Sequence, residues 1–197
     1  AARKTVFQSS GTTQADRSRH FHSPETLAVY HASLWRWFAG HLIDDSANRL
    51  LFLLPGLGQA PESSLVHMMG AVARRLPKRE QWLAADRQWR IDKQTAVDVL
   101  HDCVTNNKSI TILGTAFSFV NLLDHLNANG LEFRLPTGSA AMETGGYKGR
   151  SRAVPKPELH RAITNKLGIG TERIICEYGM CELSSQAYDG KLGQAND

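Results

Sequence analysis

The chain has 197 residues, of which 42% are hydrophobic and 21% are charged, and its formal net charge is +4. This composition favours a globular protein with one sizeable core or two small ones, and no run of about 18 apolar residues is present to span a membrane. Lys and Arg are dispersed along the chain, so we expect no nucleic acid as partner, and a basic nucleic-acid-binding domain is an alternative that rests only on the net charge. The three cysteines, Cys103, Cys176 and Cys181, form neither a CxxC pair nor a disulfide-like framework, which favours free thiols and a cytoplasmic location.

Helical spacing of apolar residues and continuous apolar runs predict the elements of the first half of the chain. Ser23 and Pro24 are typical of a helix start, and the unbroken apolar run at 49–54 is typical of a strand buried on both faces. The expected elements are an extended run at 3–7, a helix at 23–43, a strand at 49–54, a helix from 63 or 64 to 76 and a short strand at 82–85.

In the second half, Asp92 is a suitable N-cap, and Gly130 and Gly168 are suitable helix ends. The expected elements are a helix at 93–106, a strand at 109–113, a helix at 116–129, a strand at 131–135, a helix at 155–167 and a strand at 173–177. This alternation predicts an α/β fold, a layered domain with a largely parallel sheet flanked by helices. We expect residues 1–190 to form this single domain and residues 191–197 to be a disordered tail.

Gly-rich and polar loops follow most of the expected strands. In parallel α/β sheets, ligands gather at this end of the strands. The loops are 9–13, 55–58, 114–115, 145–146 and 178–182. Their convergence in one crevice is a hypothesis about topology.

The first of these loops has the composition of a phosphate site. Ser9 to Thr12 are all hydroxyl residues or glycine and Thr13 adds a hydroxyl, so that N–H and O–H groups could converge on phosphate oxygens. Arg17 and Arg19 add positive charge downstream. The alternative is an ordinary polar turn. GxxxxGK[ST] and GxGxxG are absent, so we do not expect a Walker-type NTPase.

Two later stretches also carry candidate chemistry. Residues 143–150 contain three glycines, which allow close backbone approach to a ligand, with a plain turn as the alternative. Residues 177–182 follow the last expected strand and offer the ring of Tyr178 for stacking and the carboxylate of Glu182 for a hard cation. A solvated Glu182 is the alternative.

Taken in order, Ser9-Ser10-Gly11-Thr12-Thr13, Gly145-Gly146-Tyr147 and Tyr178-Gly179-Met180-Cys181-Glu182 resemble three motifs of the adenylate-forming superfamily, which includes acyl-CoA synthetases, peptide-synthetase adenylation domains and firefly luciferase. Within it, METGGYKGRS at 142–151 and EYGMCELSSQAY at 177–188 most resemble the acyl-protein synthetase of bacterial luminescence and its relatives. The resemblance extends over nearly the whole chain.

The resemblance implies ATP-dependent activation of a fatty or other carboxylic acid as acyl-AMP, followed by transfer of the acyl group to a thiol on a protein or on CoA. It also implies an acyl reductase as a partner. Thr13 and Glu182 would be the catalytic residues and would hold Mg2+. The implied ATP-binding residues are Ser9, Ser10, Gly11, Thr12, Thr13, Arg17, Gly145, Gly146, Tyr147, Glu177, Tyr178, Gly179, Met180 and Cys181.

Each motif has an implied role. By the family's pattern, the 9–13 loop would hold the β- and γ-phosphates, Gly145 to Tyr147 would line the adenine and acyl-carboxylate region, and Tyr178 would pack on adenine. The apolar helix at 116–126 would lie beside the acyl pocket, with plain core packing as the alternative for its side chains.

The chain also departs from the family's pattern. Gln14 replaces a usual glycine, Arg17 or Arg19 would replace a usual lysine, and Cys181 replaces a usual threonine. No TGD-like motif, hinge or small C-terminal domain follows Tyr188, so the resemblance implies a central fragment that turns over poorly alone. A CoA ligase of the phenylacetate type is one alternative, and a non-catalytic binding module that kept the fold is another.

Overall fold

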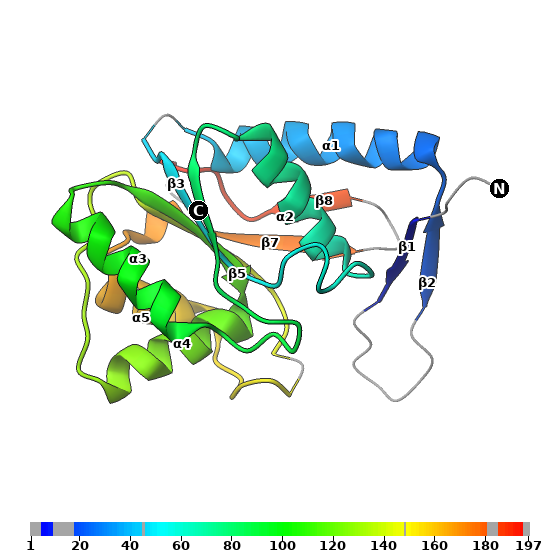
Figure 1. The fold of residues 1–197 in the computed structure, drawn as a ribbon. Helices are drawn as coiled ribbons and strands as arrows, with labels where there is room; N and C mark the ends of the chain where they lie inside the picture. Colours follow the sequence, from blue (N-terminus) through cyan, green and yellow to red (C-terminus); the bar gives the residue numbers. More distant parts are fainter. Residues whose placement is uncertain (1–4, 10–17, 45, 148, 181–184, 195–197) are drawn as a thin grey trace.

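The computed structural model describes residues 5–9, 18–44, 46–147, 149–180 and 185–194. At its centre lies a six-stranded sheet in the order β4-β3-β5-β6-β7-β8 (Figure 1). All neighbouring strands are parallel except β8, which is antiparallel to β7. The strands are β3 (Arg49–Leu53), β4 (Glu80–Leu83), β5 (Ile110–Thr115), β6 (Ala140–Thr144), β7 (Ile174–Met180) and β8 (Ser185–Tyr188). The predicted α/β fold with a largely parallel sheet is confirmed.

Helices cover both faces of the sheet, with α1 and α2 on one face and α3, α4 and α5 on the other (Figure 1). The predicted caps form: the Ser23 hydroxyl accepts from the Thr26 N–H at 3.3 Å, and the Asp92 carboxylate accepts from the Thr95 N–H at 3.1 Å. The helices are α1 (Pro24–Leu42), α2 (Ser64–Arg75), α3 (Lys93–Thr105), α4 (Ala116–Ala128), α5 (Lys156–Leu167) and a short 3-10 turn (Thr171–Arg173).

Strand β3 explains why the core has two halves. Its side chains are all buried, and because successive side chains of a strand point to opposite faces, alternate residues enter different apolar clusters. Leu50 and Phe52 pack with α1 and α2, whereas Leu51 and Leu53 pack with α3 and α4. The sheet is therefore buried on both faces, as expected for parallel strands.

A separate antiparallel ribbon, β1 (Thr5–Gln8) and β2 (Arg19–His22), lies beyond the carboxyl end of β7 (Figure 1). The Gln8 N–H donates to the Glu62 carbonyl at 2.9 Å, just before α2. Phe7 is 1% exposed and belongs to the apolar cluster under α1 and α2. The segment that begins at Ser9 therefore follows strand β1 of the ribbon and not a strand of the main sheet.

The predicted strand at 131–135 is wrong. The N–H groups of Phe133 and Leu135 donate to the carbonyls of Lys166 and Leu167, at 2.8 and 3.0 Å. These are carbonyls at the end of α5, which have no partner within the helix. The sheet position is taken instead by β6, a strand that the sequence pattern did not predict.

Smaller differences concern the ends of elements. Strand β4 begins two residues before the expected 82, and β7 extends to Met180, so Tyr178 and Gly179 pair with β8 within the sheet. Residues 191–194, which we expected to belong to a disordered tail, form a turn in which the Leu192 N–H donates to the His41 carbonyl at 3.0 Å. Over the described residues, no helix combines the length and apolar character needed to cross a membrane.

Candidate functional site

The candidate site is the edge of the sheet where the parallel strands end at their carboxyl termini. Strands β3, β5, β6 and β7 are neighbours and run in the same direction, so the segments after them meet at one edge. These segments are 55–58, the last two residues of β5 at 114–115, 145–146 and the end of β7 at 178–180. The expected convergence is confirmed for the described parts of these four of the five segments, and the edge is the one where parallel α/β proteins bind ligands.

At this edge the second and third motifs lie side by side. Thr144 pairs with Glu177 in the register of β6 and β7, which makes Gly145 and Tyr178 adjacent. A side-chain carbon at Gly145 would meet no atom within 4 Å, and the following Gly146 has a φ of +95°, a conformation that favours glycine. Tyr178 is 66% exposed. An open backbone segment and an exposed aromatic ring thus border the same space.

Glu177 lies beneath this surface and is only 3% exposed. Burial raises the pKa of its carboxyl to about 7; the nearby Glu143 acts in the same direction, and a hydrogen bond with Thr144 acts against it. A side-chain carbon at Gly179 would meet Glu177 Oε1 at 2.4 Å. Glycine at 179 therefore leaves the room that the carboxyl group occupies, and Glu177 is a buried acid below the candidate site.

Tyr188 lies opposite Glu177 in the register of β7 and β8, and the sequence reasoning gave it no role. Burial and the neighbouring Glu177 raise the pKa of its phenol. Its hydroxyl oxygen is buried and lacks a hydrogen-bond partner within the described structure. Tyr188 and Glu177 are neighbours because β7 and β8 pair, and no motif in the sequence indicates this pairing.

Tyr147 is half-buried, whereas Tyr178 is exposed. Its hydroxyl donates to the Val154 carbonyl at 2.6 Å, burial raises the pKa of its phenol, and its ring packs on the apolar cluster under α3, α4 and α5. It fixes the loop that follows Gly146 to that core.

Ser9 closes the β1–β2 ribbon, next to the candidate phosphate loop. Its N–H donates to the Ser18 carbonyl at 2.9 Å, and its hydroxyl accepts from the Ser18 N–H at 3.1 Å. The ends of the loop are thereby held together. Ser10, Gly11, Thr12, Thr13 and Arg17 lie outside the described residues.

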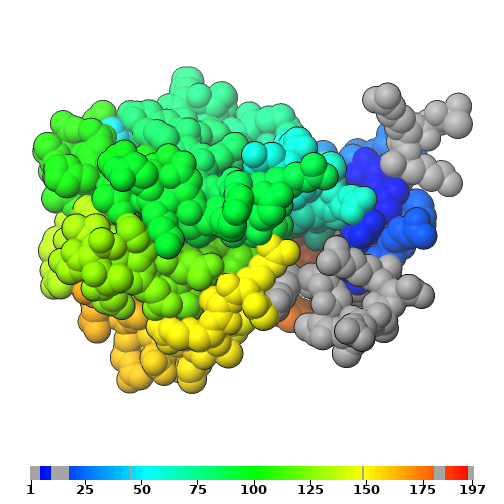
Figure 2. Space-filling view, turned by 60° about the horizontal axis from the view of Figure 1, so that its bottom comes forward, coloured from blue at the N-terminus to red at the C-terminus, as the bar shows by residue number. Residues whose placement is uncertain are grey.

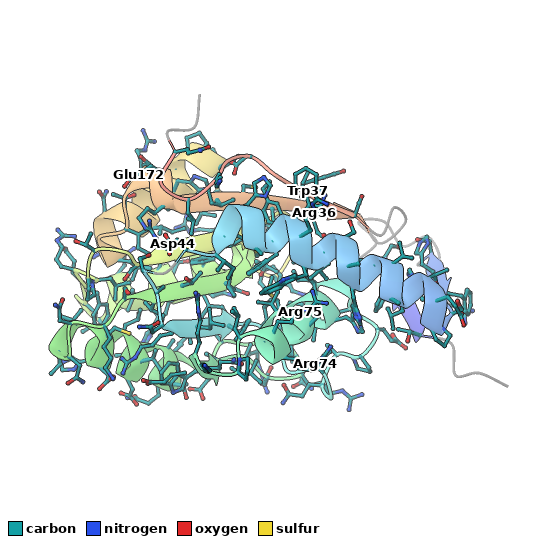
Figure 3. The ribbon with its side chains drawn as sticks, turned by 90° about the horizontal axis from the view of Figure 1, so that it is seen from above. Arg36, Trp37, Asp44, Arg74, Arg75 and Glu172 are labelled. Atoms are coloured by element: carbon teal, nitrogen blue, oxygen red, sulfur yellow. The ribbon has the colours of Figure 1, made fainter. Side chains whose placement is uncertain are left out.

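An aromatic and histidine cluster supports the ribbon from below. Phe7 contacts the rings of Tyr30 and His67, with centroids 5.9 and 5.0 Å apart. His67 on α2 and His31 on α1 stack, and their Nε2 atoms are 2.7 Å apart. Burial, with His31 and Arg74 nearby, lowers the pKa of His67 to about 4. Figure 3 shows Arg74 and Arg75 on α2 beside α1.

The predicted metal ligands are not described. Cys181 and Glu182 lie outside the described residues, as does Thr13, and of Met180 only the backbone is described. The structure therefore leaves the Mg2+ prediction untested. Within the described residues, no three His, Cys, Asp or Glu side chains are grouped so as to hold a metal ion.

The expected acyl-pocket helix, α4, mainly packs in the core. Phe119, Val120 and Leu122 are all at most 1% exposed. Phe117, at its start, instead contacts the ring of Trp89, with centroids 5.8 Å apart. The guanidinium group of Arg150 lies 5.6 Å from the centroid of each of these two rings. The sequence reasoning missed this group because its members come from three separate segments.

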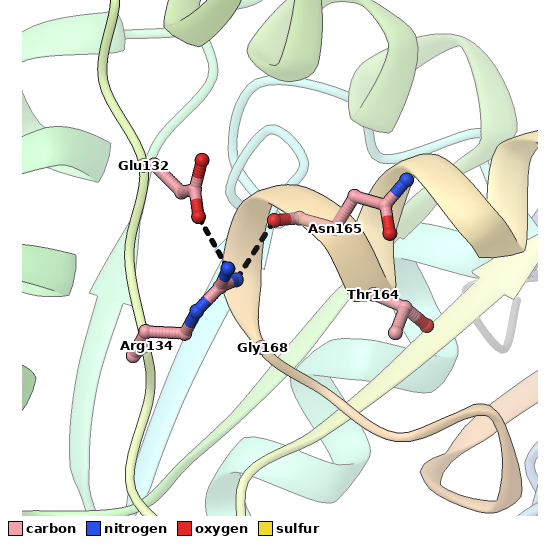
Figure 4. A pocket seen from close by; sticks show the side chains of 5 residues that line it. All are labelled: Glu132, Arg134, Thr164, Asn165 and Gly168. Atoms are coloured by element: carbon pink, nitrogen blue, oxygen red, sulfur yellow. Dashed lines mark hydrogen bonds and ion pairs between the residues drawn. The ribbon is translucent and has the colours of Figure 1, made fainter.

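Two shallow pockets lie at the opposite, amino edge of the sheet. One, of about 600 Å³, lies between the segment before β6 and the end of α5 (Figure 4). There Arg134 donates to the Asn165 carbonyl at 2.9 Å and pairs with Glu132 at 2.5 Å. The other, of about 550 Å³, is lined by Ser46 and Lys108 among others. None of the predicted site residues lines either pocket.

The fold and this edge define a parallel α/β protein with its candidate site at the carboxyl ends of the strands. A scan against protein-family models finds no match, and a comparison with curated proteins finds none. Among solved structures, the chain is similar to an open conformation of 2-hydroxyisobutyryl-CoA ligase in complex with 2-HIB-AMP and CoA, with 15% sequence identity and a TM-score of 0.58. The similarity covers 91% of this chain and 36% of that ligase. This chain therefore has the fold of part of a CoA ligase and spans about a third of its length.

Proposed function

We propose that this chain is the nucleotide-binding part of an adenylate-forming enzyme, which activates a carboxylic acid as its acyl-adenylate and transfers the acyl group to a thiol. The observation that carries the proposal is the exposed ring of Tyr178 beside the open backbone of Gly145. Two of the three motifs that resemble the adenylate-forming superfamily thus border one surface. The similarity in fold to part of a CoA ligase supports the same reading.

The described residues fit an adenosine group in two respects. Tyr178 offers a ring face of the kind on which bases stack, and Gly145 leaves room for a flat ligand to approach the backbone. ATP would supply the α-phosphate that the acid attacks. The residues of this chain would orient the two reactants, because adenylyl transfer depends on positioning and on neutralising charge more than on a protein nucleophile.

We also propose the kind of acid that is activated and the kind of thiol that accepts the acyl group. The stretches at 142–151 and 177–188 resemble the acyl-protein synthetase of bacterial luminescence, which favours a fatty acid, a protein thiol as acceptor and an acyl reductase as partner. The name of the structural neighbour favours CoA as acceptor and a small hydroxy acid as substrate. In a longer chain that includes the family's small C-terminal domain, release of product on CoA or on a protein thiol would decide between them. We further propose that residues 1–190 form a single nucleotide-binding domain.

A ligand-induced shift in thermal unfolding tests the proposal. The probe is a non-hydrolysable acyl-adenylate mimic, an acyl sulfamoyl adenosine. At about 100 times its dissociation constant it is expected to stabilise the fold by about 2.7 kcal/mol. Tyr178→Ala should weaken the mimic by about 1 to 3 kcal/mol, the usual contribution of a stacked base, and Tyr178→Phe should retain most of the affinity.

The matched control is Trp37→Ala, which removes another exposed aromatic ring, 48% exposed on α1. Each variant is compared with its own unfolding temperature without ligand, so that a change in stability is not read as a change in binding. Equal weakening by Tyr178→Ala and Trp37→Ala, or no shift in the wild type, would contradict the proposal. A fold that lost its chemistry, the non-catalytic alternative, would give the second result.

A further inference from the structure

Arg150 is an exposed cation without an acidic partner at the carboxyl edge. Its neighbour in sequence, Arg152, pairs with Asp124 at 2.9 Å, and at the amino edge both Arg49 and Arg173 pair with carboxylates. No carboxylate of the described residues lies within ion-pair distance of Arg150. Its contacts are with two aromatic rings and a backbone carbonyl.

Two aromatic rings hold the guanidinium group in place. Its centre lies 5.6 Å from the centroids of both Trp89 and Phe117, close enough for cation–π attraction. One terminal nitrogen donates to the Gln88 carbonyl at 3.1 Å. A guanidinium group has five N–H donors in a planar fork, so donors remain for a further acceptor.

The platform beneath Arg150 is itself fixed. Trp89 has a φ of +64°, a conformation that a bulky residue adopts only when its surroundings impose it. Asp86 imposes it: its carboxylate accepts from the Gln88 and Arg90 N–H groups, both at 2.9 Å, and its carbonyl accepts from the Trp89 N–H at 2.8 Å. The segment is closed by the bridge between Ala85 and Ile91.

The place in the fold is that of the candidate site. Phe117 is the second residue of α4, which directly follows β5, and Arg150 follows the glycine loop after β6. The backbone N–H of Arg150 donates to the Tyr147 carbonyl at 2.8 Å. Figure 2 shows the yellow segment around residue 150 lying against the green surface of the preceding half of the chain. An oriented, unpaired guanidinium group therefore borders the edge where ligands of such sheets bind.

We propose that Arg150, held on Trp89 and Phe117, binds an oxyanion of the reactants. The planar fork suits the two oxygens of a carboxylate or of a phosphate. The proposal rests on the proposed function for the source of the anion, which is either the carboxylate of the acid before activation or a phosphate of the acceptor.

The test is a nuclear magnetic resonance titration of the chain as it is, observed at the indole N–H of Trp89. The chain has four tryptophans, and Trp89→Phe identifies the signal. Hexanoate probes the carboxylate, inorganic pyrophosphate probes the phosphate, and hexanol has a similar apolar chain without the charge. We expect one of the two anions to shift the Trp89 signal in a saturable way and hexanol to leave it unchanged; the tighter anion identifies the source.

Variants connect the signal to Arg150. Arg150→Gln should weaken the anion about tenfold or more, since hydrogen bonds to charged groups are the stronger ones, and Arg150→Lys should recover part of the affinity because it keeps the charge without the fork. Arg152→Gln, the matched control, should bind like the wild type. Absence of any shift with both anions, or equal affinities for the wild type and Arg150→Gln, would overturn the proposal.

The two proposals fail separately. The adenylate mimic has no free carboxylate, and its binding is measured by thermal unfolding and by the effect of Tyr178→Ala. Binding of the anion is measured at the indole signal of Trp89. An anion that binds through Arg150 supports this inference even where the mimic does not bind. A mimic that binds in a chain whose Trp89 signal ignores both anions overturns this inference and leaves the proposed function standing.

Discussion

The two edges of the sheet differ in the partners of their buried and oriented polar groups. At the amino edge, buried Arg49 pairs with Asp102 at 2.5 Å and with Glu80 at 3.1 Å. Arg173 at the same edge pairs with Asp44 at 2.8 Å and donates to the carbonyls of Gly138 and Ser139, at 2.8 and 2.9 Å.

At the carboxyl edge, in the part of the chain that the structure describes, some charges are also paired, such as Asp86 with Arg90 at 2.7 Å, but three polar groups lack such ion pairs. Glu177 is buried without a basic neighbour among the groups that shift its pKa, Arg150 rests on aromatic rings, and the Tyr188 hydroxyl is buried without a hydrogen bond. Perturbed and unpaired groups gather where chemistry takes place, whereas paired networks serve the fold. The comparison thus supports our proposal that a ligand binds at the carboxyl edge, whereas the ion pairs of Arg49 and Arg173 stabilise the amino edge.

Removal of Arg49 should have the largest effect on the amino edge. Arg49→Ala removes a buried guanidinium group from the half-exposed carboxylates of Asp102 and Glu80 and from the ring of Trp82, and we expect the free energy of unfolding to fall by about 2 to 3 kcal/mol, measured by urea denaturation. Lys108→Ala is the matched control because Lys108 pairs with the same Glu80 from the surface, at 3.5 Å, where such pairs contribute about 0 to 1 kcal/mol. Similar losses in both variants would break the assignment of stability to Arg49.

Replacement of Glu177 should instead raise the free energy of unfolding at alkaline pH. The carboxyl has a pKa of about 7 in the fold and 4.5 as its ordinary value, so between these values the unfolded chain holds fewer protons and stability falls as pH rises. Glu177→Gln removes the buried charge, and we expect it to stabilise the fold by about 2 kcal/mol at pH 8 and to have little effect near pH 4.

Chemical denaturation at several pH values checks this expectation. Glu172→Gln is the control, since Glu172 is exposed and its loss should leave the pH dependence of the wild type in place. A Glu177→Gln variant that is less stable than the wild type at pH 8 would mean that the charged carboxylate has a partner in the fold.

Replacement of His67 should have a smaller effect. Its pKa is lowered from 6.5 to about 4, so between these values the unfolded chain binds more protons and stability rises with pH. His67→Gln should remove this rise, worth about 1 kcal/mol after discounting for partial exposure. His101→Gln, on the exposed side of α3, should retain it. An unchanged slope between pH 4 and 6.5 in His67→Gln would contradict a proton-free pair with His31.

Local signals in the sequence account for much of the fold. Ser23 and Asp92 cap helices through their own side chains, and the apolar run of β3 identifies a doubly buried strand. The run at 131–135 has the same strand-like pattern, yet its N–H groups bond to the end of α5. Which acceptor a segment finds depends on tertiary packing, and sequence periodicity does not contain that information.

Some parts of the candidate site could likewise be predicted from the sequence, and others could not. The glycines at 145 and 146 and the ring of Tyr178 follow from motifs, and the strand register brings them together. The platform of Arg150 joins residues about 60 positions apart, with one hydrogen bond to the carbonyl of Gln88. Backbone acceptors and ring contacts of this kind leave no mark in the local pattern.

Hydrogen exchange of the chain with and without the acyl-adenylate mimic tests the difference between the two edges most directly, because exchange locates protection along the chain. The account predicts slower exchange at 143–150 and 174–180, around Gly145 and Tyr178, and no change at 131–137 and 164–168 beside the amino-edge pocket. Protection confined to the amino-edge segments, or absent from both edges at a saturating concentration, would contradict the assignment of ligand binding to the carboxyl edge.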